Sequence, residues 1–384
     1  MTQTVFPLDR FRALQTPFYY YDIDLLRATL AEVAQYQQRY GYKVHYAIKA
    51  NANPRLLAEI RQAGLGIDCV SGNEVQCALD NGFDPRDIVF AGVGKADWEI
   101  RLALNAGIGC FNVESLPELE VIDELAREAG KCANIALRIN PNVDAHTHQY
   151  ITTGLEENKF GIGLWELDSI LDAAVQMKGV TLKGIHFHIG SQITDLDAFK
   201  ALCSRINEIS KHIVEQRKLP IEIINVGGGL GVDYEYPDAK PMADFGAYFT
   251  TFRRFLDVRA GQEVHFELGR AIVAQCGSLI SRVLYVKKGQ RKQFAIIDAG
   301  MNDLIRPALY HAFHRIQNLS STEAVQKYDV VGPVCESSDC FGISQVLPLT
   351  RRGDFIAIRS AGAYGEVMAS HYNLRKFAQT YFSN

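Results

Sequence analysis

Short apolar runs alternate with longer segments of helical period over the first two thirds of the chain. The runs are rich in β-branched and aromatic residues, which is typical of buried strands. Between them, Pro54–Ala63, Leu116–Ala129 and Leu196–Gln216 have the spacing of amphipathic helices. The predicted strands are Val44–Ile48, Gly66–Val70, Asp87–Phe90, Cys110–Val113, Asn134–Ile139, Gly184–Ile189, Ile223–Val226 and Glu263–Phe266. Eight strand–helix units predict an α/β fold, a (β/α)8 barrel of the TIM type.

The pattern changes after Arg270, where strand-like runs follow one another without long helices. Glycine-containing turns at 288–290 and 351–354 favour hairpins, so we predict a mainly antiparallel β domain, a β-barrel or sandwich. Pro17–Tyr21 adds a strand to it. The predicted strands are Ser278–Lys287, Gln293–Asp298, Tyr328–Val334, Gln345–Leu349 and Asp354–Ser360. The expected domains are therefore a barrel over 24–266 and a β domain made of 1–23 and 267–384.

Composition and charge narrow the class of function. The chain has 384 residues, of which 47% are hydrophobic and 22% charged, and its formal net charge is -4. These values are typical of a globular protein and give no electrostatic reason to expect a nucleic-acid or membrane partner. The N-terminal stretch does not resemble a signal peptide, and no run of about 18 apolar residues occurs. The eight cysteines form no C-x-x-C pair, so we expect reduced thiols and a cytoplasmic protein.

Polar residues gather where the predicted barrel strands end, and that rim carries the active site in barrels of this type. Lys49 follows the first strand, and a desolvated lysine there is an amine nucleophile. Glycines 227–229 and 231 follow the seventh strand and can present bare N–H groups to a phosphate. Glu267 and Arg270 end the eighth strand with a carboxylate and an anion binder. With the ring of His188, this set matches the needs of pyridoxal phosphate.

Each feature alone also has an ordinary structural explanation. Lys49 could cap a strand at the solvent edge, and a glycine run is common in tight turns. Glu267 and Arg270 could form a surface ion pair, and His188 could be a core histidine. The coincidence of all of them on one rim favours the cofactor.

Several stretches in order along the chain resemble a known family, the fold type III, alanine-racemase-fold pyridoxal phosphate decarboxylases. They cover nearly the whole chain, which makes the resemblance specific. The stretches are Tyr46–Asn51, His186–Gln192, Gly227–Gly231, Glu267–Arg270, Cys335–Asp339 and Gly362–Tyr364.

The resemblance implies a role for each cofactor residue. Lys49 forms the aldimine with pyridoxal phosphate, His188 stacks on its ring, and Glu267 pairs with the ring nitrogen. Asp68 supports the lysine or the cofactor, and Tyr364 reaches the phosphate or the substrate. The residues expected around the phosphate are Ser191, Gly228, Gly229, Gly269 and Arg270.

The segment Arg306–Tyr310 also resembles the family, and this resemblance implies which chemical groups the substrate carries. Arg306 and Tyr310 hold a distal carboxylate, a task that Arg270 can share, and Glu336 accepts a distal ammonium. A fixed cation and a fixed anion suit a substrate with an amino acid group at each end. The implied reaction is decarboxylation of meso-2,6-diaminopimelate to L-lysine and carbon dioxide. The alternative for Arg306 is a turn-stabilising Arg–Pro pair.

The Cys335–Asp339 loop resembles the segment in which the family keeps its proton donor. Cys335 would protonate the carbanion that decarboxylation leaves, which a thiol can do near neutral pH. In the family this loop completes the active site of a neighbouring subunit, so the resemblance implies a homodimer with shared sites. The chain departs from the family at Leu268, where proline is usual; we expect a more mobile loop and altered cofactor affinity, with the chemistry kept.

Other activities remain open on these residues. The same barrel could carry an ornithine, lysine or arginine decarboxylase, an amino acid racemase, or a cofactor carrier without catalysis. The pairs His146/His148 and His186/His188 also raise a metal-dependent hydrolase. The later strands offer glycines, Glu267 and Arg270 in place of further metal ligands, which disfavours that reading.

Overall fold

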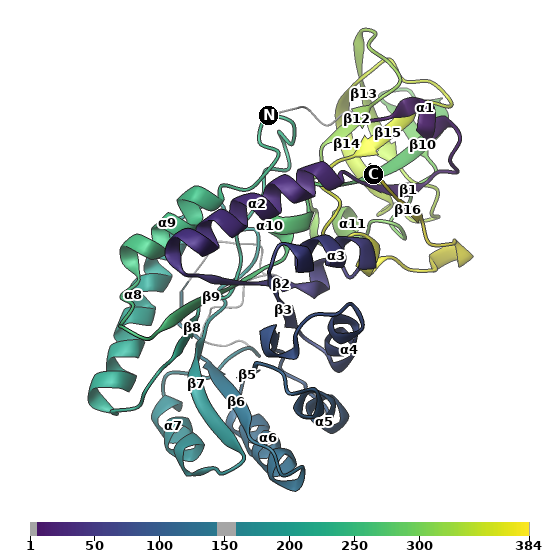
Figure 1. The fold of residues 1–384 in the computed structure, drawn as a ribbon. Helices are drawn as coiled ribbons and strands as arrows, with labels where there is room; N and C mark the ends of the chain where they lie inside the picture. The colour runs from purple at the N-terminus through teal and green to yellow at the C-terminus, as the bar shows by residue number, and fades with distance from the viewer. Residues whose placement is uncertain (1–5, 144–158, 384) are drawn as a thin grey trace. The chain divides into compact units, whose positions relative to one another are not determined.

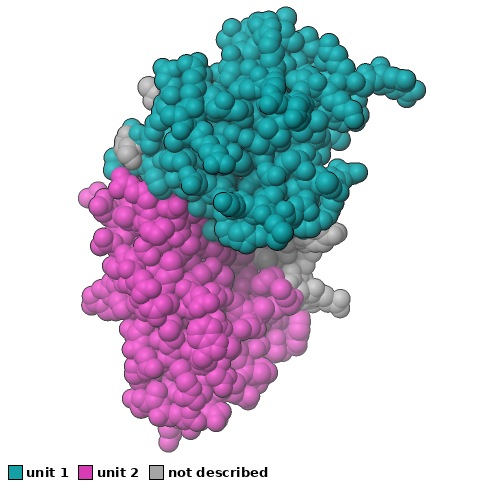
Figure 2. Space-filling view, turned by 90° about the vertical axis from the view of Figure 1, so that its right-hand side faces the viewer, with its two compact units in different colours: residues 1–29, 232–243, 270–384 teal, residues 30–231, 244–269 magenta. Residues whose placement is uncertain are grey.

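The computed structural model describes residues 6–143 and 159–383. The chain divides into two compact units, coloured separately in Figure 2. Unit 1 consists of residues 1–29, 232–243 and 270–384, and unit 2 consists of residues 30–231 and 244–269. The expected domain limits put 232–243 with the barrel, whereas the structure groups this short segment with the β unit.

Unit 2 contains a closed barrel of eight strands in which every neighbouring pair is parallel (Figure 1). The barrel closes where β2 pairs with β9, with His45 opposite Glu267. The strands are β2 (Lys43–Ala47), β3 (Gly66–Cys69), β4 (Ile88–Phe90), β5 (Cys110–Val113), β6 (Ala133–Arg138), β7 (Val180–His186), β8 (Ile223–Asn225) and β9 (Glu263–Leu268). The predicted TIM-type barrel is thereby confirmed.

Helices connect the barrel strands, and local signals fix their ends. Ser71 and Ser115 cap α4 and α6 by accepting hydrogen bonds from the backbone N–H groups of Glu74 and Glu118. Gly107 ends α5 in the left-handed conformation that glycine tolerates. The α-helices are α2 (Ile23–Tyr40), α3 (Pro54–Gln62), α4 (Gly72–Asp80), α5 (Asp97–Ala106), α6 (Leu116–Glu128), α7 (Leu167–Gln176), α8 (Asp197–Lys211) and α9 (Phe245–Phe255).

Three strand and helix limits differ from the prediction in ways that affect the site. Strand β7 begins at Val180 and ends at His186, so His188 lies in the loop that follows it. Lys49 lies in the 3-10 turn η1 (Ile48–Ala50) directly after β2. The predicted helix 196–216 is α8 followed by a π-helical turn, η3 (His212–Gln216). A second 3-10 turn, η2 (Pro85–Asp87), precedes β4.

Unit 1 is built on an eight-stranded sheet with the order β12-β15-β10-β11-β13-β14, to which β1 is added beside β10 and β16 beside β1. Its strands are β1 (Phe18–Tyr21), β10 (Gly277–Lys288), β11 (Gln293–Ile297), β12 (Ile316–Asn318), β13 (Val325–Val331), β14 (Cys340–Pro348), β15 (Phe355–Ile358) and β16 (Gln379–Phe382). Its helical segments are α1 (Leu8–Arg12), α10 (Arg270–Val273), α11 (Arg306–Tyr310), η4 (Glu366–Met368) and η5 (Tyr372–Leu374).

Most pairs in this sheet are antiparallel, which confirms the predicted β domain. Two pairs are parallel instead, β11 with β13 and β1 with β16. Strands β12 and β16 lie outside the predicted set. The N-terminal segment packs into the sheet through a cluster that includes Phe11, Phe18, Ile280 and Phe355. No helix in the described ranges is long and apolar enough to cross a membrane.

Candidate active site

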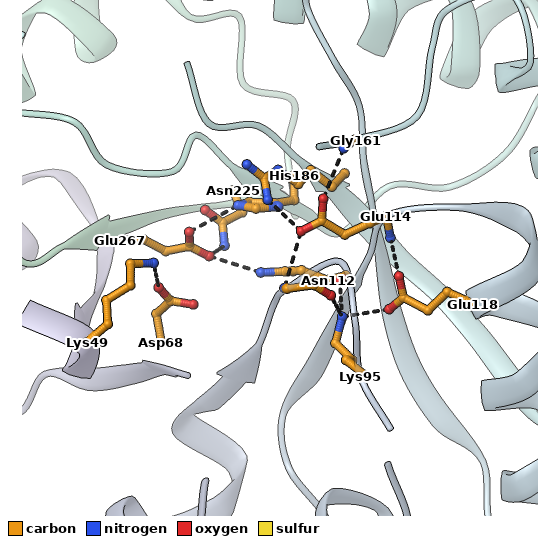
Figure 3. Close-up of polar contacts among 12 residues, drawn as sticks. Lys49, Asp68, Lys95, Asn112, Glu114, Glu118, Gly161, His186, Asn225 and Glu267 are labelled. Carbon is orange, nitrogen blue, oxygen red and sulfur yellow. Dashed lines mark hydrogen bonds and ion pairs between the residues drawn. The ribbon is translucent and has the colours of Figure 1, made fainter. Parts of the chain in front are cut away.

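Lys49 and Asp68 form an ion pair at the carboxyl end of the first two barrel strands (Figure 3). The pairing of β2 with β3 places Ala47 beside Asp68, and the turn after β2 brings the Lys49 Nζ within 3.2 Å of the Asp68 Oδ2. Burial, together with the negative charge of Glu267, raises the pKa of Asp68 to about 7 in spite of the neighbouring ammonium. The Asp68 Oδ1 is buried and lacks a hydrogen-bond partner within residues 6–143 and 159–383.

Glu267 near the end of β9 is held by three donors from three other strands (Figure 3). Its Oε1 accepts from the side-chain amides of Asn112 at 3.0 Å and Asn225 at 2.8 Å, and its Oε2 lies 3.0 Å from the Nε2 of His186. Burial raises the pKa of Glu267, but the adjacent His186 and the charge of Lys49 lower it by more, so the net shift of the pKa is downward. The carboxylate is thus ionised and fixed in orientation.

Glycines allow the backbone after β8 to approach its neighbours very closely. A Cβ atom on Gly227 would lie 2.1 Å from the carbonyl oxygen of Phe187, and one on Gly228 would lie 1.9 Å from that of Glu267. Gly227 and Gly229 also have positive φ values of 71° and 108°. The N–H groups of Gly227 and Gly228 donate to the side chains of Asn225 and His188. The turn therefore leaves the N–H of Gly229, and the room that its glycines make, for a phosphate.

His188 receives a hydrogen bond on its Nδ1 from the N–H of Gly228 at 3.2 Å. Burial and the positive charges of Arg138 and Lys49 lower the pKa of His188 well below its usual value. The imidazole is therefore neutral, a flat ring suited to stacking. Ser191 lies in the same loop after β7.

Gly269 and Leu268 follow Glu267 at the end of β9. A Cβ on Gly269 would lie 3.1 Å from the Cβ of Ala50, in the turn that carries Lys49. Leu268 is buried and in register with Tyr46, so the strand continues through the position where the family usually has proline. The altered cofactor affinity expected from Leu268 stays a prediction.

These residues of unit 2 fit pyridoxal phosphate. The cofactor requires an amine, and Lys49 supplies one beside the buried carboxylate of Asp68. It also requires an ionised carboxylate, a neutral ring and a turn that leaves room for a phosphate, and Glu267, His188 and the glycine turn supply these. Four of the residues named from sequence interact with one another through hydrogen bonds or charge: Lys49, Asp68, His188 and Glu267.

Unit 1 holds a separate cluster of two arginines around one phenol. The Nη1 atoms of Arg270 and Arg306 lie 2.7 and 2.9 Å from the hydroxyl of Tyr234, and the guanidinium of Arg270 lies over the ring of Tyr364 at 4.9 Å. Both arginines are 6% exposed. Arg306 also donates to the Nε2 of His314 at 3.0 Å. Tyr310, at the end of α11, contributes to the electrostatic environment of Arg270.

The Cys335–Asp339 loop is exposed at its tip and anchored at its end. The buried carboxylate of Asp339 accepts hydrogen bonds from the backbone N–H groups of Val334 at 2.6 Å and Met301 at 2.7 Å. Cys335 is an exposed free thiol. The exposed Glu336 accepts hydrogen bonds from the hydroxyls of Tyr372 and Ser338, which belong to η5 and to the same loop. Arg306 bonds instead to Tyr234 and His314.

Sequence reasoning missed Asn112, Asn225 and Tyr234, and it considered His186 only as a metal ligand. Asn112 and Asn225 are buried polar residues inside apolar strands, and a buried amide needs a partner; that signal could have found them. A second layer was also missed, in which the buried Lys95 donates to the backbone carbonyl of Asn112 at 2.9 Å and to Glu118 at 2.6 Å (Figure 3).

Two of the four histidines considered for a metal site lie in the described part of the chain, and both make other contacts. His186 bonds to Glu267 and His188 to Gly228. His146 and His148 lie outside the described residues. Among the residues that are described, no group of three or more His, Cys, Asp or Glu side chains is arranged to hold a metal ion.

The chain is similar over its whole length to known decarboxylases. Residues 26–274 match the family model described as the pyridoxal-binding domain of pyridoxal-dependent decarboxylases. A diaminopimelate decarboxylase of Bacteroides thetaiotaomicron is 59% identical over 381 residues, 99% of this chain and 98% of that protein. One of Helicobacter pylori (strain J99) is 42% identical over 367 residues, 95% of this chain and 89% of that protein.

Solved structures agree with these matches. The crystal structure of diaminopimelate decarboxylase from Helicobacter pylori complexed with L-lysine has a TM-score of 0.91 and 41% identity, covering 98% of this chain and 94% of that one. A lysine/ornithine decarboxylase from Vibrio vulnificus, complexed with cadaverine, has a TM-score of 0.85 at 21% identity over 98% of this chain and 97% of that one, which is likeness of fold. With the residues above in place for pyridoxal phosphate as cofactor, the chain belongs to the pyridoxal-dependent decarboxylases, in the family of its diaminopimelate decarboxylase relatives.

Proposed function

We propose that the protein removes one carboxylate of meso-2,6-diaminopimelate to give L-lysine and carbon dioxide, a step of lysine biosynthesis. One observation carries the choice of substrate: the buried guanidiniums of Arg270 and Arg306 meet at Tyr234, and Arg306 has no carboxylate partner in the described parts of the chain. Buried cations need an anion. A distal carboxylate on the substrate supplies one, and lysine, ornithine and arginine have no such group.

The cofactor residues of unit 2 have distinct tasks in this proposal. Bound pyridoxal phosphate supplies an electron sink for the bonding electrons that the leaving carboxylate gives up. The Lys49 amine attaches the cofactor and exchanges protons with the carboxylate of Asp68, whose pKa of about 7 suits that exchange. The ionised Glu267 would hold the ring nitrogen in its protonated form, and the neutral ring of His188 would offer a flat surface to the cofactor.

Phosphate binding is assigned to the glycine turn and its neighbours. Gly229 offers a backbone N–H group, Gly228 and Gly269 room for close approach, Ser191 a hydroxyl, and Arg270 a positive charge. Tyr364, whose ring lies under the Arg270 guanidinium, is assigned to the phosphate or the substrate.

Cys335, Glu336 and Tyr310 complete the substrate assignments. The thiol of Cys335 delivers a proton to the carbon that has lost carbon dioxide, Glu336 accepts the distal ammonium, and Tyr310 assists Arg306 at the distal carboxylate. We further propose a homodimer in which this loop serves the active site of the partner subunit. The exposure of Cys335 and Glu336, on a loop anchored by Asp339, supports that arrangement.

The working location that we propose is the cytoplasm. All eight cysteines are free thiols, and free thiols are the usual state in a reducing compartment.

The test is carbon dioxide release from meso-diaminopimelate, compared with ornithine, lysine and arginine, by the purified enzyme loaded with pyridoxal phosphate. We expect turnover of the first alone. Borohydride should bleach the visible absorbance and leave a heavier peptide that contains Lys49. Better turnover of ornithine or lysine than of diaminopimelate would show that the substrate assignment is wrong. Sedimentation of the holoenzyme, and activity recovered on mixing inactive Lys49→Ala and Cys335→Ala subunits, test the shared dimer.

A further inference from the structure

The hydroxyl of Tyr234 is shared by two arginines from different helices. Arg270 begins α10 and Arg306 begins α11, and both donate an Nη1 hydrogen to the same phenol oxygen. The guanidinium of Arg306 also lies 5.2 Å from the centre of the Tyr234 ring. A single side chain therefore sets how far apart the two cations lie.

Two buried guanidiniums this close repel each other, and the phenol reduces that repulsion. Burial and the charge of Arg270 lower the pKa of Arg306. Burial raises the pKa of Tyr234, but the two arginines outweigh it and the net shift is downward. The neighbouring His314 adds no charge, because burial and Arg306 lower its pKa to about 3 and it accepts from Arg306.

The bonding capacity of the phenol oxygen points to a third partner. A phenol oxygen has two lone pairs and one proton. Both lone pairs of Tyr234 accept from arginines, so its O–H proton is left to donate. Two guanidiniums beside this O–H favour an anionic acceptor, and a carboxylate provides two oxygens for the purpose.

The segment that carries Tyr234 is fixed within unit 1. Asp238 accepts from the buried guanidinium of Arg359 at 2.9 Å and from the side-chain amide of Gln317 at 3.0 Å. Arg359 lies just after β15, and Gln317 lies on β12. The position of Tyr234 is thus tied to the sheet.

We propose that Tyr234 is a specificity-determining positioning residue: it fixes Arg270 and Arg306 as one clamp and donates its hydroxyl proton to the distal carboxylate of the substrate. The identity of that substrate rests on the proposed function. A substrate without a distal carboxylate gains nothing from the clamp and gives the buried Arg306 no counter-ion.

The test compares Tyr234→Phe with the unchanged holoenzyme, and Tyr248→Phe serves as the matched control. Tyr248 is buried, and its hydroxyl has no hydrogen-bond partner among the described residues. The first readout is calorimetric binding of pimelate, a dicarboxylate with the chain length of diaminopimelate, which requires no turnover. We expect Tyr234→Phe to weaken pimelate binding and raise the KM for diaminopimelate by roughly tenfold or more, the usual cost of losing a hydrogen bond to a charged group. The kcat should change much less, and cofactor absorbance should be kept.

A second variant separates positioning from a general structural effect. Because Tyr234 acts partly through Arg306, adding Tyr234→Phe to Arg306→Lys should weaken pimelate binding by less than the sum of the two single effects. Equal pimelate affinity in Tyr234→Phe and the unchanged enzyme, or fully additive effects, would overturn the proposal. If diaminopimelate is not decarboxylated but pimelate binding still depends on Tyr234, the proposed function fails while the clamp stands.

Discussion

His186 lies 3.0 Å from Glu267, Nε2 to Oε2, across two strands of the barrel, and both side chains are buried. Asn225, on the strand between them, is in register with His186 and donates to the other oxygen of the same carboxylate. The ionisation of Glu267 is therefore controlled by its neighbours and hardly by solvent.

Replacing Glu267 with glutamine should lower kcat by about 100-fold, because a neutral amide cannot stabilise a protonated ring nitrogen. Cofactor binding should persist, since Lys49 and the glycine turn are unchanged. Steady-state kinetics and visible absorbance measure the two effects. Glu263→Gln is the control on the same strand, where the carboxylate is 50% exposed and paired with Lys43. Equal losses in both variants would contradict the role of Glu267.

Asp68 should make the stability of the apoenzyme fall as pH rises from about 4 to 7. Its pKa is about 7 in the folded protein and about 3.9 in an unfolded chain. The folded state therefore binds the proton more tightly, and the stability gained at low pH is lost as the pH rises through 7. Asp68→Asn removes this dependence. Between pH 5 and 8 the Tm of the unchanged protein should therefore fall relative to the Tm of the variant. Parallel Tm curves would refute the shift.

Gly228→Ala should destabilise the barrel and abolish cofactor binding. Its Cβ would lie 1.9 Å from the carbonyl oxygen of Glu267, so strand β9 has to move, at a cost of about 1–3 kcal/mol. Thermal unfolding and pyridoxal phosphate titration measure the two losses. Gly94→Ala is the matched control, because no atom lies within 4 Å of its added Cβ. Normal cofactor affinity in Gly228→Ala would argue against the phosphate turn.

Arg359→Met should loosen the segment that carries Tyr234. It removes a buried partner of Asp238, and breaking such a pair costs roughly 3 kcal/mol. We expect a lower Tm together with a higher KM for diaminopimelate. Arg351→Met is the control, because its partner Glu323 and Arg351 itself are exposed and surface pairs contribute little. A lower Tm with an unchanged KM would show that Tyr234 keeps its place without Arg359.

The sequence predicted the barrel well because each strand is a short apolar run between helical segments. It also located Lys49, Asp68, His188 and Glu267, since polar residues after apolar strands are conspicuous. In unit 1 the pairing of β11 with β13 could not be anticipated, because α11 and β12 lie between them and the long connection permits a parallel arrangement.

The donors around Glu267 and the phenol between the arginines depend on contacts that periodicity does not encode. Asn112 is 155 residues from Glu267, and Tyr234 is 36 and 72 residues from Arg270 and Arg306. A polar residue in an apolar strand signals that a partner exists, but the barrel closure decides which one. Tyr234 follows the glycine turn in a segment without regular period, where no pattern marked it.

The interleaving of the two units along the chain has a consequence for how they can be made. The chain passes from one unit to the other at residues 29/30, 231/232, 243/244 and 269/270. Strand β1 pairs with β10 and β16 in the sheet, and β16 lies near the C-terminus, so it is synthesised long after β1. A fragment that stops at residue 269 would hold every barrel strand yet leave the aromatic residues of β1 without their partner strands. Unit 1 can therefore complete its sheet only after β16 has been synthesised, and removal of β16 takes from β1 one of its two partner strands.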